Sequence, residues 1–376
     1  MDADVGVIGV GTMGSMAMWQ LAKRGVKVIG FEQFGIGHDR SGVGGESRIF
    51  RTAYKEGSEY VPILKESYKY WRNLESDSGN DLLTLSGALM IGNPESDFMK
   101  NVMTGIEEHQ LDHEVFNANQ AKKKYPQHKL LPDEIMVLDK MGGFLRPEYA
   151  VVSAVNSAKE LGAQVHRHSK IESIETNNAG VIIHTKSGEE YSVGKVIIAT
   201  GAWTGKLMPN LKKETSINRI KMTWFPPKNR MDFNQEKFPV FIRKTDDVEL
   251  YGVPSLDGTT VKVSFTYKHD YVKDPDFLNR SVDLEHLPNI NYYIEKFFPG
   301  LYPDPVRISA YMDLYTPDKH PILGEVSELK NTIIVSGFSG HGFKMSPIIG
   351  KMAADIALDG KTNFPINRFS PNRLLD

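Results

Sequence analysis

Two arginines give the first indication of chemistry in this chain. Arg48 and Arg51 lie three residues apart, directly after the stretch 38–47, which holds three glycines and two serines. Such a stretch is a loop by composition, and its backbone can come close to a ligand. If a helical turn follows, both guanidinium groups lie on one face of it and repel unless an anion lies beside them. The pair therefore predicts a site for a negatively charged group, and a plain connecting loop is the alternative.

A glycine turn near the start of the chain predicts a second binding element. The apolar stretch 5–8 breaks into G-x-G-x-x-G at residues 9–14 and continues as a predicted helix from Thr12. This arrangement lets the backbone approach a pyrophosphate and directs unpaired N–H groups towards it. Glu32 ends the next predicted strand, 18 residues after Gly14, where an acidic side chain accepts hydrogen bonds from ribose hydroxyls. Together these features predict a dinucleotide site.

Two later stretches repeat the pattern of a strand that ends in a glycine turn. The apolar strand predicted at 195–198 leads into Ala-Thr-Gly at 199–201, which is typical of a flavoprotein strand passing beneath its cofactor. A strand at 333–336 leads into Gly-Phe-Ser-Gly-His-Gly-Phe-Lys at 337–344 and then into a helix at 347–358. A helix N-terminus after a glycine loop attracts negative charge, such as that of a reduced flavin ring. A simple left-handed turn is the alternative.

The composition excludes several classes of function. A chain of 376 residues that is 40% hydrophobic and 24% charged is typical of a soluble globular protein of two domains. A net charge of −2 without a long basic run excludes nucleic acid as an expected partner. No apolar run approaches the ~20 residues that span a bilayer, and the acidic first residues do not resemble a secretory signal, so we expect a cytoplasmic protein. The absence of cysteine excludes a cysteinyl link to a cofactor.

The elements that must position these residues alternate along the chain. Helices are predicted at 17–24, 60–74, 97–110, 120–124 and 148–161, and strands at 26–31, 82–91, 164–168, 171–175, 181–185 and 191–193. Aromatic-rich strands at 251–254 and 260–265 would form walls of a substrate pocket. By pattern alone, Lys262 is a solvent-facing lysine of such a strand. His166 and His168 share one face of their strand, but no further ligands stand at a useful spacing, so we expect no metal site.

These stretches carry a resemblance to a known family. Residues 9–14, 46–54 with 56–57 and 60–62, 199–203 and 337–344 resemble the monomeric sarcosine oxidase and N-methyltryptophan oxidase family, over nearly the whole chain. This family of amine-oxidising flavoproteins lies within the broader D-amino-acid oxidase fold group. Residues 316–318 and 321–324 also resemble the segment with which that wider group approaches the flavin.

The resemblance implies a mixed α/β fold and a domain arrangement. A Rossmann-like FAD-binding domain would be discontinuous, at residues 1–85, 145–215 and 305–376. The substrate-binding domain, built on an antiparallel or mixed sheet, would be inserted at 86–144 and 216–304. The resemblance also implies FAD, a small-molecule amine and O2 as ligands of a monomer.

The resemblance assigns roles to single residues. Arg51 and Lys344 match the positions that bind the substrate carboxylate, and Tyr251 matches an aromatic residue that closes over it. Lys262 matches the lysine beside flavin N5 that helps O2 accept electrons, and Arg48 matches its neighbour over the ring. A fixed cation in a water-poor site stabilises the negative charge that develops on O2. We expect the cofactor to be bound by Gly9, Gly11, Thr12, Met13, Gly14, Glu32, Ser41, Arg48, Ile171, Thr200, Gly201, Trp203, Gly340, His341, Gly342, Phe343 and Lys344.

Three departures from the family pattern bear on cofactor and substrate. Tyr311 stands where family members usually carry the cysteine that tethers the flavin, so we expect non-covalent FAD. Gly44 replaces one of the paired histidines of the first loop. Thr266 and Asp313 stand where a histidine and a tyrosine are usual. The physiological substrate therefore need not be sarcosine itself.

The sequence predicts an FAD-dependent oxidase of a secondary or N-substituted amino acid, in which an N-methyl, cyclic or glycated amine becomes an imine that hydrolyses and O2 becomes H2O2. Two alternatives stay open. A dehydrogenase would pass the electrons to a quinone or a carrier, and a redox sensor would bind flavin without turnover. The predicted carboxylate clamp argues against the sensor, which has no need of one.

Overall fold

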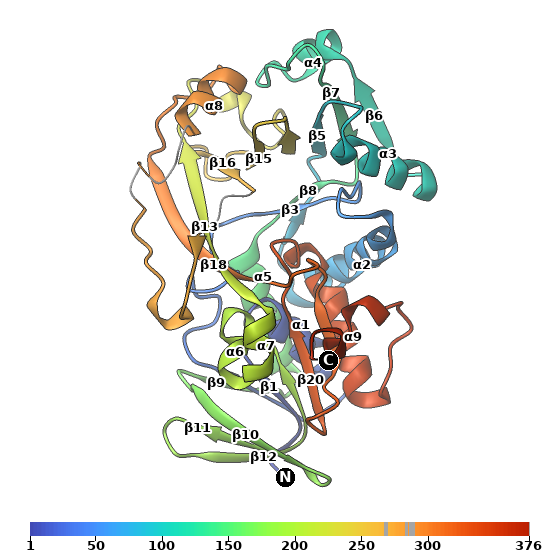
Figure 1. Ribbon diagram of the computed structural model, residues 1–376, viewed down its shortest axis with the longest axis vertical. Coiled ribbons are helices and arrows are strands. Elements are labelled where there is room, and N and C mark those ends of the chain that lie inside the picture. The colour runs from blue at the N-terminus through green and yellow to red at the C-terminus, as the bar shows by residue number, and fades with distance from the viewer. Residues whose placement is uncertain (267–269, 283–284, 286–289, 376) are drawn as a thin grey trace.

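Two large β-sheets organise the chain in the computed structural model, which describes residues 1–266, 270–282, 285 and 290–375 (Figure 1). The eight-stranded first sheet consists of β1 (Ala3–Ile8), β2 (Val28–Glu32), β9 (Gln164–Arg167), β10 (Ile171–Asn177), β11 (Gly180–Thr185), β12 (Glu190–Ile198), β19 (Ile322–Glu325) and β20 (Thr332–Ser336). The nine-stranded second sheet consists of β5 (Ala88–Gly92), β6 (His113–Phe116), β7 (Ile135–Asp139), β13 (Ser216–Phe225), β14 (Val240–Lys244), β15 (Glu249–Val253), β16 (Val261–Phe265), β17 (Asp270–Tyr271) and β18 (Arg307–Tyr315). The predicted mixed α/β class is confirmed.

The first sheet is parallel at its centre. Parallel pairings join β9, β2, β1, β12 and β20, while β10, β11 and β19 pair antiparallel at its margins. Strands β1, β2, β12 and β20 therefore end at one edge, and each is followed there by a turn that carries predicted site residues. The carboxyl edge of a parallel sheet is where open α/β folds bind their ligands.

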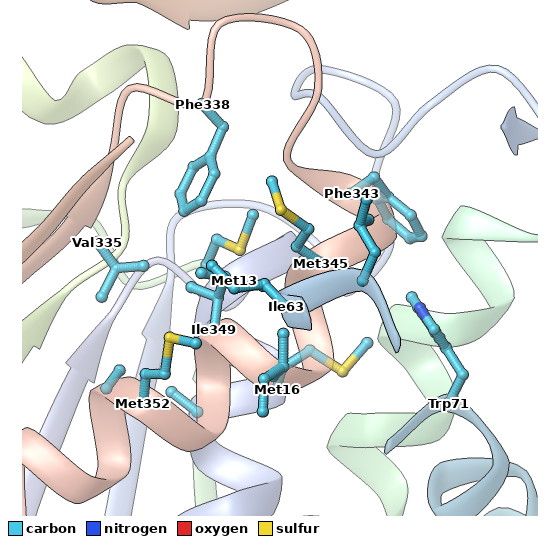
Figure 2. Packing of buried hydrophobic residues seen from close by; sticks show 14 of the residues in the cluster. Met13, Met16, Ile63, Trp71, Val335, Phe338, Phe343, Met345, Ile349 and Met352 are labelled. Carbon is cyan, nitrogen blue, oxygen red and sulfur yellow. The ribbon is translucent and has the colours of Figure 1, made fainter. Parts of the chain in front are cut away.

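Four helices pack together beside this sheet, and two of them, α1 (Thr12–Lys23) and α9 (Ser346–Asp359), contact its strands. Helix α1 contacts both α5 (Pro147–Glu160) and α9, and α2 (Val61–Ser78) packs beside α9. Figure 2 shows their apolar side chains, among them Met16 of α1, Trp71 of α2 and Met352 of α9, meeting in one buried cluster. An ideal Cβ on Gly350 would lie 2.5 Å from the backbone of Met16, so only glycine lets α9 approach α1 this closely.

The second sheet lies at the other end of the molecule, in the upper part of Figure 1. Its pairings are antiparallel except for β5 with β14. The remaining elements are helices α3 (Asp97–His109), α4 (Ala118–Lys124), α6 (Thr204–Leu207), α7 (Pro209–Glu214) and α8 (Ile290–Phe297), and a small sheet of β3 (Arg48–Phe50), β4 (Leu83–Thr84) and β8 (Gly143–Leu145). Short 3₁₀ helices include η2 (Gly201–Trp203) and η6 (Phe343–Met345).

The structure corrects three local predictions. The strand predicted at 82–91 is two strands, β4 and β5, which belong to different sheets. The strands predicted at 191–193 and 195–198 are one strand, β12, because Gly194 between them stays extended beside the carbonyl oxygen of Asp4, 2.8 Å from where a Cβ would lie. Arg48 does not begin a helical turn. It begins β3, where residues 48–50 pair with β8.

The predicted domain boundaries remain a prediction. The position of one strand, β18, concerns the boundary at residue 305. β18 pairs with β13 along nine residues, from Ser216 with Tyr315 to Trp224 with Arg307. Residues 307–315 therefore belong to the second sheet, although the boundary at 305 assigns them to the FAD-binding domain.

In the part of the chain that the structure describes, no helix has the length and apolar composition needed to cross a lipid bilayer.

A buried histidine lies inside the second sheet's core. The His128 ring is stacked on that of Phe238, with centroids 4.9 Å apart, and neither ring nitrogen has a hydrogen-bond partner. Burial, helped by the Arg243 charge, lowers the pKa of His128 from 6.5 to about 3. The ring is thus neutral in the folded protein at neutral pH.

We expect His128 to make the folded state sensitive to acid. Between pH 6.5 and 3 the unfolded chain binds a proton that the folded protein does not, so the free energy of unfolding falls as pH falls, by up to about 1.4 kcal/mol per pH unit from this residue. His128→Phe should flatten that dependence, measured as melting temperature at several pH values, while His113→Gln on the partly exposed strand β6 should keep it. An unchanged slope in His128→Phe would contradict this role.

Candidate active site

One cavity reaches from the carboxyl edge of the first sheet to the second sheet. All predicted site residues except Gly14 and Lys262 line it. They are Gly9, Gly11, Thr12, Met13, Glu32, Ser41, Arg48, Arg51, Ile171, Thr200, Gly201, Trp203, Tyr251 and the five residues from Gly340 to Lys344. Further walls come from side chains to which the sequence assigned no place in the site, including His38, Glu56, Met222, Met312, Tyr315 and Phe338.

The glycine turn after β1 is closely packed at two positions and open at the third. A Cβ on Gly14 would lie 1.9 Å from the carbonyl oxygen of Gly9, and one on Gly9 would lie 2.6 Å from that of Ala199. Gly14 thus lies behind the cavity and allows α1 to start there. A Cβ on Gly11, by contrast, would meet no atom within 4 Å and would project into open space. In the described part of the chain no side chain caps α1, so its first N–H groups can bind an anion.

Glu32 is held at the end of β2 with acceptor capacity to spare. Its carboxylate accepts hydrogen bonds from the backbone N–H of Val10 at 3.1 Å and of Phe34 at 2.9 Å, and His38 lies 3.4 Å away. A carboxylate offers about four acceptor positions, so positions remain for hydroxyl groups of a ligand. Across the cavity, Trp203 is fixed by an Nε1–H bond to Asp276 at 2.6 Å.

Two cations hold the glycine-rich loop from different sides. Arg48 donates to the carbonyl oxygens of Gly42 at 2.7 Å and Gly44 at 2.6 Å. Lys262 donates to those of Gly45 at 2.9 Å and Ser47 at 2.7 Å. Burial and the Arg48 charge hold the pKa of Lys262 well below its usual value. Lys262 therefore lies behind the loop that forms the cavity wall, and not on the cavity surface.

Gly44 and Tyr311 depend on each other sterically. A Cβ on Gly44 would lie 2.3 Å from a ring carbon of Tyr311. Two of the four positions predicted to depart from the family pattern thus face one another, and the missing side chain at Gly44 makes room for the Tyr311 ring. That ring lies where the tethering cysteine would be expected.

The anion predicted beside the arginine pair is supplied by the protein. Glu56 accepts from Nη2 of Arg51 at 2.9 Å and 2.6 Å, while the buried Nε of Arg51 has no partner. Burial would raise the pKa of Glu56, but the positive charges of Arg51 and Lys55 outweigh it and hold that pKa at about 2. Glu56 lies five residues after Arg51, in a stretch that resembles the family. The residues around it gave no indication that it would pair with Arg51.

Lys344 is fixed through both its backbone and its side chain. Its carbonyl oxygen accepts from Ser67 Oγ at 2.6 Å and Trp71 Nε1 at 2.9 Å, and its Nζ donates to the His341 carbonyl oxygen at 2.8 Å. Burial, together with the Arg51 charge, lowers the pKa of Lys344 to about 7. The ammonium group is thus poised to change its charge near neutral pH.

His341 is a neutral imidazole that connects the Tyr54 hydroxyl to the backbone of Lys319. Its Nε2 donates to the carbonyl oxygen of Lys319 at 3.0 Å, because a carbonyl only accepts, and Nδ1 therefore accepts from the Tyr54 hydroxyl at 2.8 Å. Burial lowers the pKa of His341 to about 4, in keeping with this neutral tautomer.

Asp313 places a carboxylate on the cavity wall. It accepts from the backbone N–H groups of Gly340 and Leu314, at 2.8 Å and 2.9 Å. Burial raises the pKa of Asp313 to about 6, although those N–H groups and the charges of Arg48 and Lys344 oppose the shift. The sequence marked this position as a departure but indicated no role for it.

The ends of the cavity suit a dinucleotide that carries an electron-accepting ring. An open glycine turn, an uncapped helix start and a spare carboxylate at one end match an adenosine diphosphate, and cations at the other end match a ring that gains negative charge. The chain belongs to the FAD-dependent oxidoreductase family, whose model matches residues 4–356. It is a sarcosine oxidase-like flavoenzyme that acts on CH–NH donors, and without cysteine it has no cysteinyl link to FAD.

Relatives match the chain over almost its full length. It is 34% identical to the monomeric sarcosine oxidase of Streptomyces avermitilis, over 99% of this chain and 97% of that protein. It is 28% identical to the N-methyl-L-tryptophan oxidase of Yersinia pestis, over 98% of this chain and 99% of the relative. The fold matches those of the amino acid oxidase NikD (TM-score 0.86, 21% identity, 98% and 97% of the two chains) and of L-proline dehydrogenase from P. horikoshii (TM-score 0.84, 23% identity, 99% and 97%).

Two glycine variants separate the fold from cofactor binding. Gly11→Ala should leave the melting temperature of the FAD-free protein unchanged but weaken FAD binding by about tenfold or more, because the methyl group enters the open space at the turn. Gly14→Ala should destabilise the FAD-free protein itself, by about 1–3 kcal/mol, because its methyl group overlaps the Gly9 carbonyl. FAD affinity and FAD-free melting temperature are the two measurements.

If Gly11→Ala binds FAD as tightly as the wild-type protein, the open space at this turn is not the cofactor site.

Proposed function

We propose that the enzyme oxidises a secondary or N-substituted amino acid, in which the amine is N-methylated, cyclic or glycated. The observation that carries this proposal is the pair of buried cations, Arg51 and Lys344, that lie on the same cavity as the glycine turn. Two charge-assisted contacts of about 1.5–3 kcal/mol each would strongly favour an amine that carries a carboxylate. The names of the curated relatives, sarcosine oxidase and N-methyl-L-tryptophan oxidase, support the same substrate class.

The chain's own residues bind and orient the substrate. Lys344 and Arg51 hold the carboxylate, with Glu56 keeping the Arg51 guanidinium in place. Tyr251 lies on the cavity wall, and burial raises its pKa, so its hydroxyl stays protonated as the ring closes over the substrate. Met222, Phe338 and Phe343 add apolar surface that excludes water from the reacting C–H bond.

Bound FAD would supply the two-electron acceptor for the C–H bond beside the amine nitrogen and the route by which those electrons reach O2. The amine would lose two electrons and two protons to become an imine. Water would hydrolyse an open-chain imine to a carbonyl compound and a shorter amine, and a cyclic imine to one ring-opened amino carbonyl compound, while O2 would take up the two electrons and two protons as H2O2. Arg48 and Lys262 would supply the fixed positive charge that favours electron transfer to O2. We also propose that the enzyme works as a monomer, within the predicted division into FAD-binding and substrate-binding domains.

The proposal is tested by product stoichiometry with a panel of N-methyl, cyclic and glycated amino acids in air. An oxidase yields one H2O2 for each carbonyl compound formed. A dehydrogenase would form carbonyl product with a quinone present but little H2O2, and a sensor would form neither product with any member of the panel.

Lys344 should make carboxylate binding depend on pH. Because the pKa of Lys344 is about 7, its amino group carries a positive charge below that pH and loses the charge above it. The affinity for a carboxylate ligand should therefore fall as pH rises, and the midpoint of this fall should lie at or above pH 7. Lys344→Met should weaken binding about tenfold or more at pH 6.5 and remove this dependence, whereas Lys344→Arg should keep binding constant above pH 8. The measurement is ligand affinity from the change in flavin absorbance.

Unchanged affinity in Lys344→Met would show that Lys344 does not contact the carboxylate.

A further inference from the structure

One carboxylate on the cavity wall forms no ion pair with any residue that the structure describes. Three acidic side chains of the described residues line the cavity, and Glu56 is paired with Arg51 while Glu32 lies near His38. Asp313 is different, because no Lys, Arg or His nitrogen among the described residues lies within 4.0 Å of its carboxylate. A carboxylate removed from bulk water is stabilised most by a cation that arrives with a ligand.

Asp313 is held next to the proposed carboxylate site. Its side chain accepts from the backbone N–H of Gly340, and Lys344 Nζ donates to the carbonyl oxygen of the next residue, His341. An anion and a cation are thus tied to consecutive residues of one loop, whose Cα atoms stand about 3.8 Å apart. An α-amino acid carries its carboxylate and its amine on the same carbon, so its zwitterion presents two opposite charges close together.

The two basic side chains whose charges act on Asp313, Arg48 and Lys344, direct their N–H groups elsewhere. The guanidinium group of Arg48 donates hydrogen bonds to the carbonyl oxygens of Gly42, Gly44 and Ser47. The Lys344 ammonium is directed to His341 and Tyr54. Asp313 lines the cavity, so its carboxylate can contact a ligand that is bound there.

We propose that Asp313 binds the positively charged amine nitrogen of the substrate, so that the site accepts an amino acid as its zwitterion. Arg51 and Lys344 take the carboxylate, and Asp313 takes the ammonium group. This inference rests on the proposed function and narrows it, because it makes the charge on nitrogen a condition for tight binding. Asp313 is thus assigned as a specificity-determining residue that contacts the substrate.

A pair of carboxylic acids of equal shape tests this assignment. Trimethylglycine and 3,3-dimethylbutanoate differ only in a positively charged nitrogen in place of a carbon, and neither carries an amine that can be oxidised. We expect the wild-type FAD-loaded enzyme to bind trimethylglycine about tenfold or more tightly than 3,3-dimethylbutanoate, measured by the change in flavin absorbance. Asp313→Asn, which keeps an oxygen to accept from Gly340, should lose this preference without losing affinity for 3,3-dimethylbutanoate.

The control variant is Asp304→Asn, an exposed carboxylate nine residues before Asp313 that accepts a hydrogen bond from Asn291 outside the cavity. It should leave both affinities unchanged. A preference that survives in Asp313→Asn, or an equal loss of affinity for both acids, overturns the assignment. If the wild-type enzyme binds both acids equally yet oxidises N-methyl amino acids, Asp313 is wrongly assigned and the proposed function stands. If it binds neither acid, the carboxylate clamp and the proposed function fail instead.

Discussion

The active site depends on holding four basic side chains close together, of which three are buried and Arg48 is half-buried. Arg48, Arg51, Lys262 and Lys344 repel one another in a region of low polarity, and the protein satisfies them mainly with its own backbone. Carbonyl oxygens of the loop 42–47 accept from Arg48 and Lys262, and that of His341 accepts from Lys344. Only Arg51 among the four receives a carboxylate, from Glu56. Neutral carbonyls satisfy hydrogen bonds without cancelling charge, so the cavity remains attractive to an anionic ligand.

The two sheets divide the work of building this site. The parallel sheet brings four strand ends to one edge, and the turns that follow them form the region suited to the dinucleotide. The antiparallel sheet contributes the side chains around the reacting end, from β13, β15 and β18. The chain has no cysteine for a cysteinyl link, so these turns would contribute much of the hold on FAD through hydrogen bonds and close backbone approach. Tyr311 packs against Gly44 beside this region.

Local sequence patterns predicted the glycine turns and most helices well, because a strand, a glycine turn and a helix interact within a few residues. Strand pairings and ion pairs between residues far apart in the sequence could not be predicted from local patterns. Arg48 lies in a strand because β3 pairs with β8, almost 100 residues later. The pairing of β18 with β13 and the use of Glu56 by Arg51 likewise need three-dimensional proximity. The roles of Lys262 and Tyr251 came from family resemblance alone, and their pattern indicated only ordinary strand residues.

Rapid anaerobic mixing tests whether the buried Arg51 and Lys344 select amines that carry a carboxylate. The FAD-loaded enzyme is mixed with an N-methyl amino acid or with the matching N-methyl amine that lacks the carboxylate, and bleaching of the flavin absorbance is followed. We expect fast, saturable bleaching by the amino acid and bleaching slower by about 100-fold or more with the amine. Equal bleaching rates, or no bleaching by any N-methyl, cyclic or glycated amino acid, would contradict this expectation.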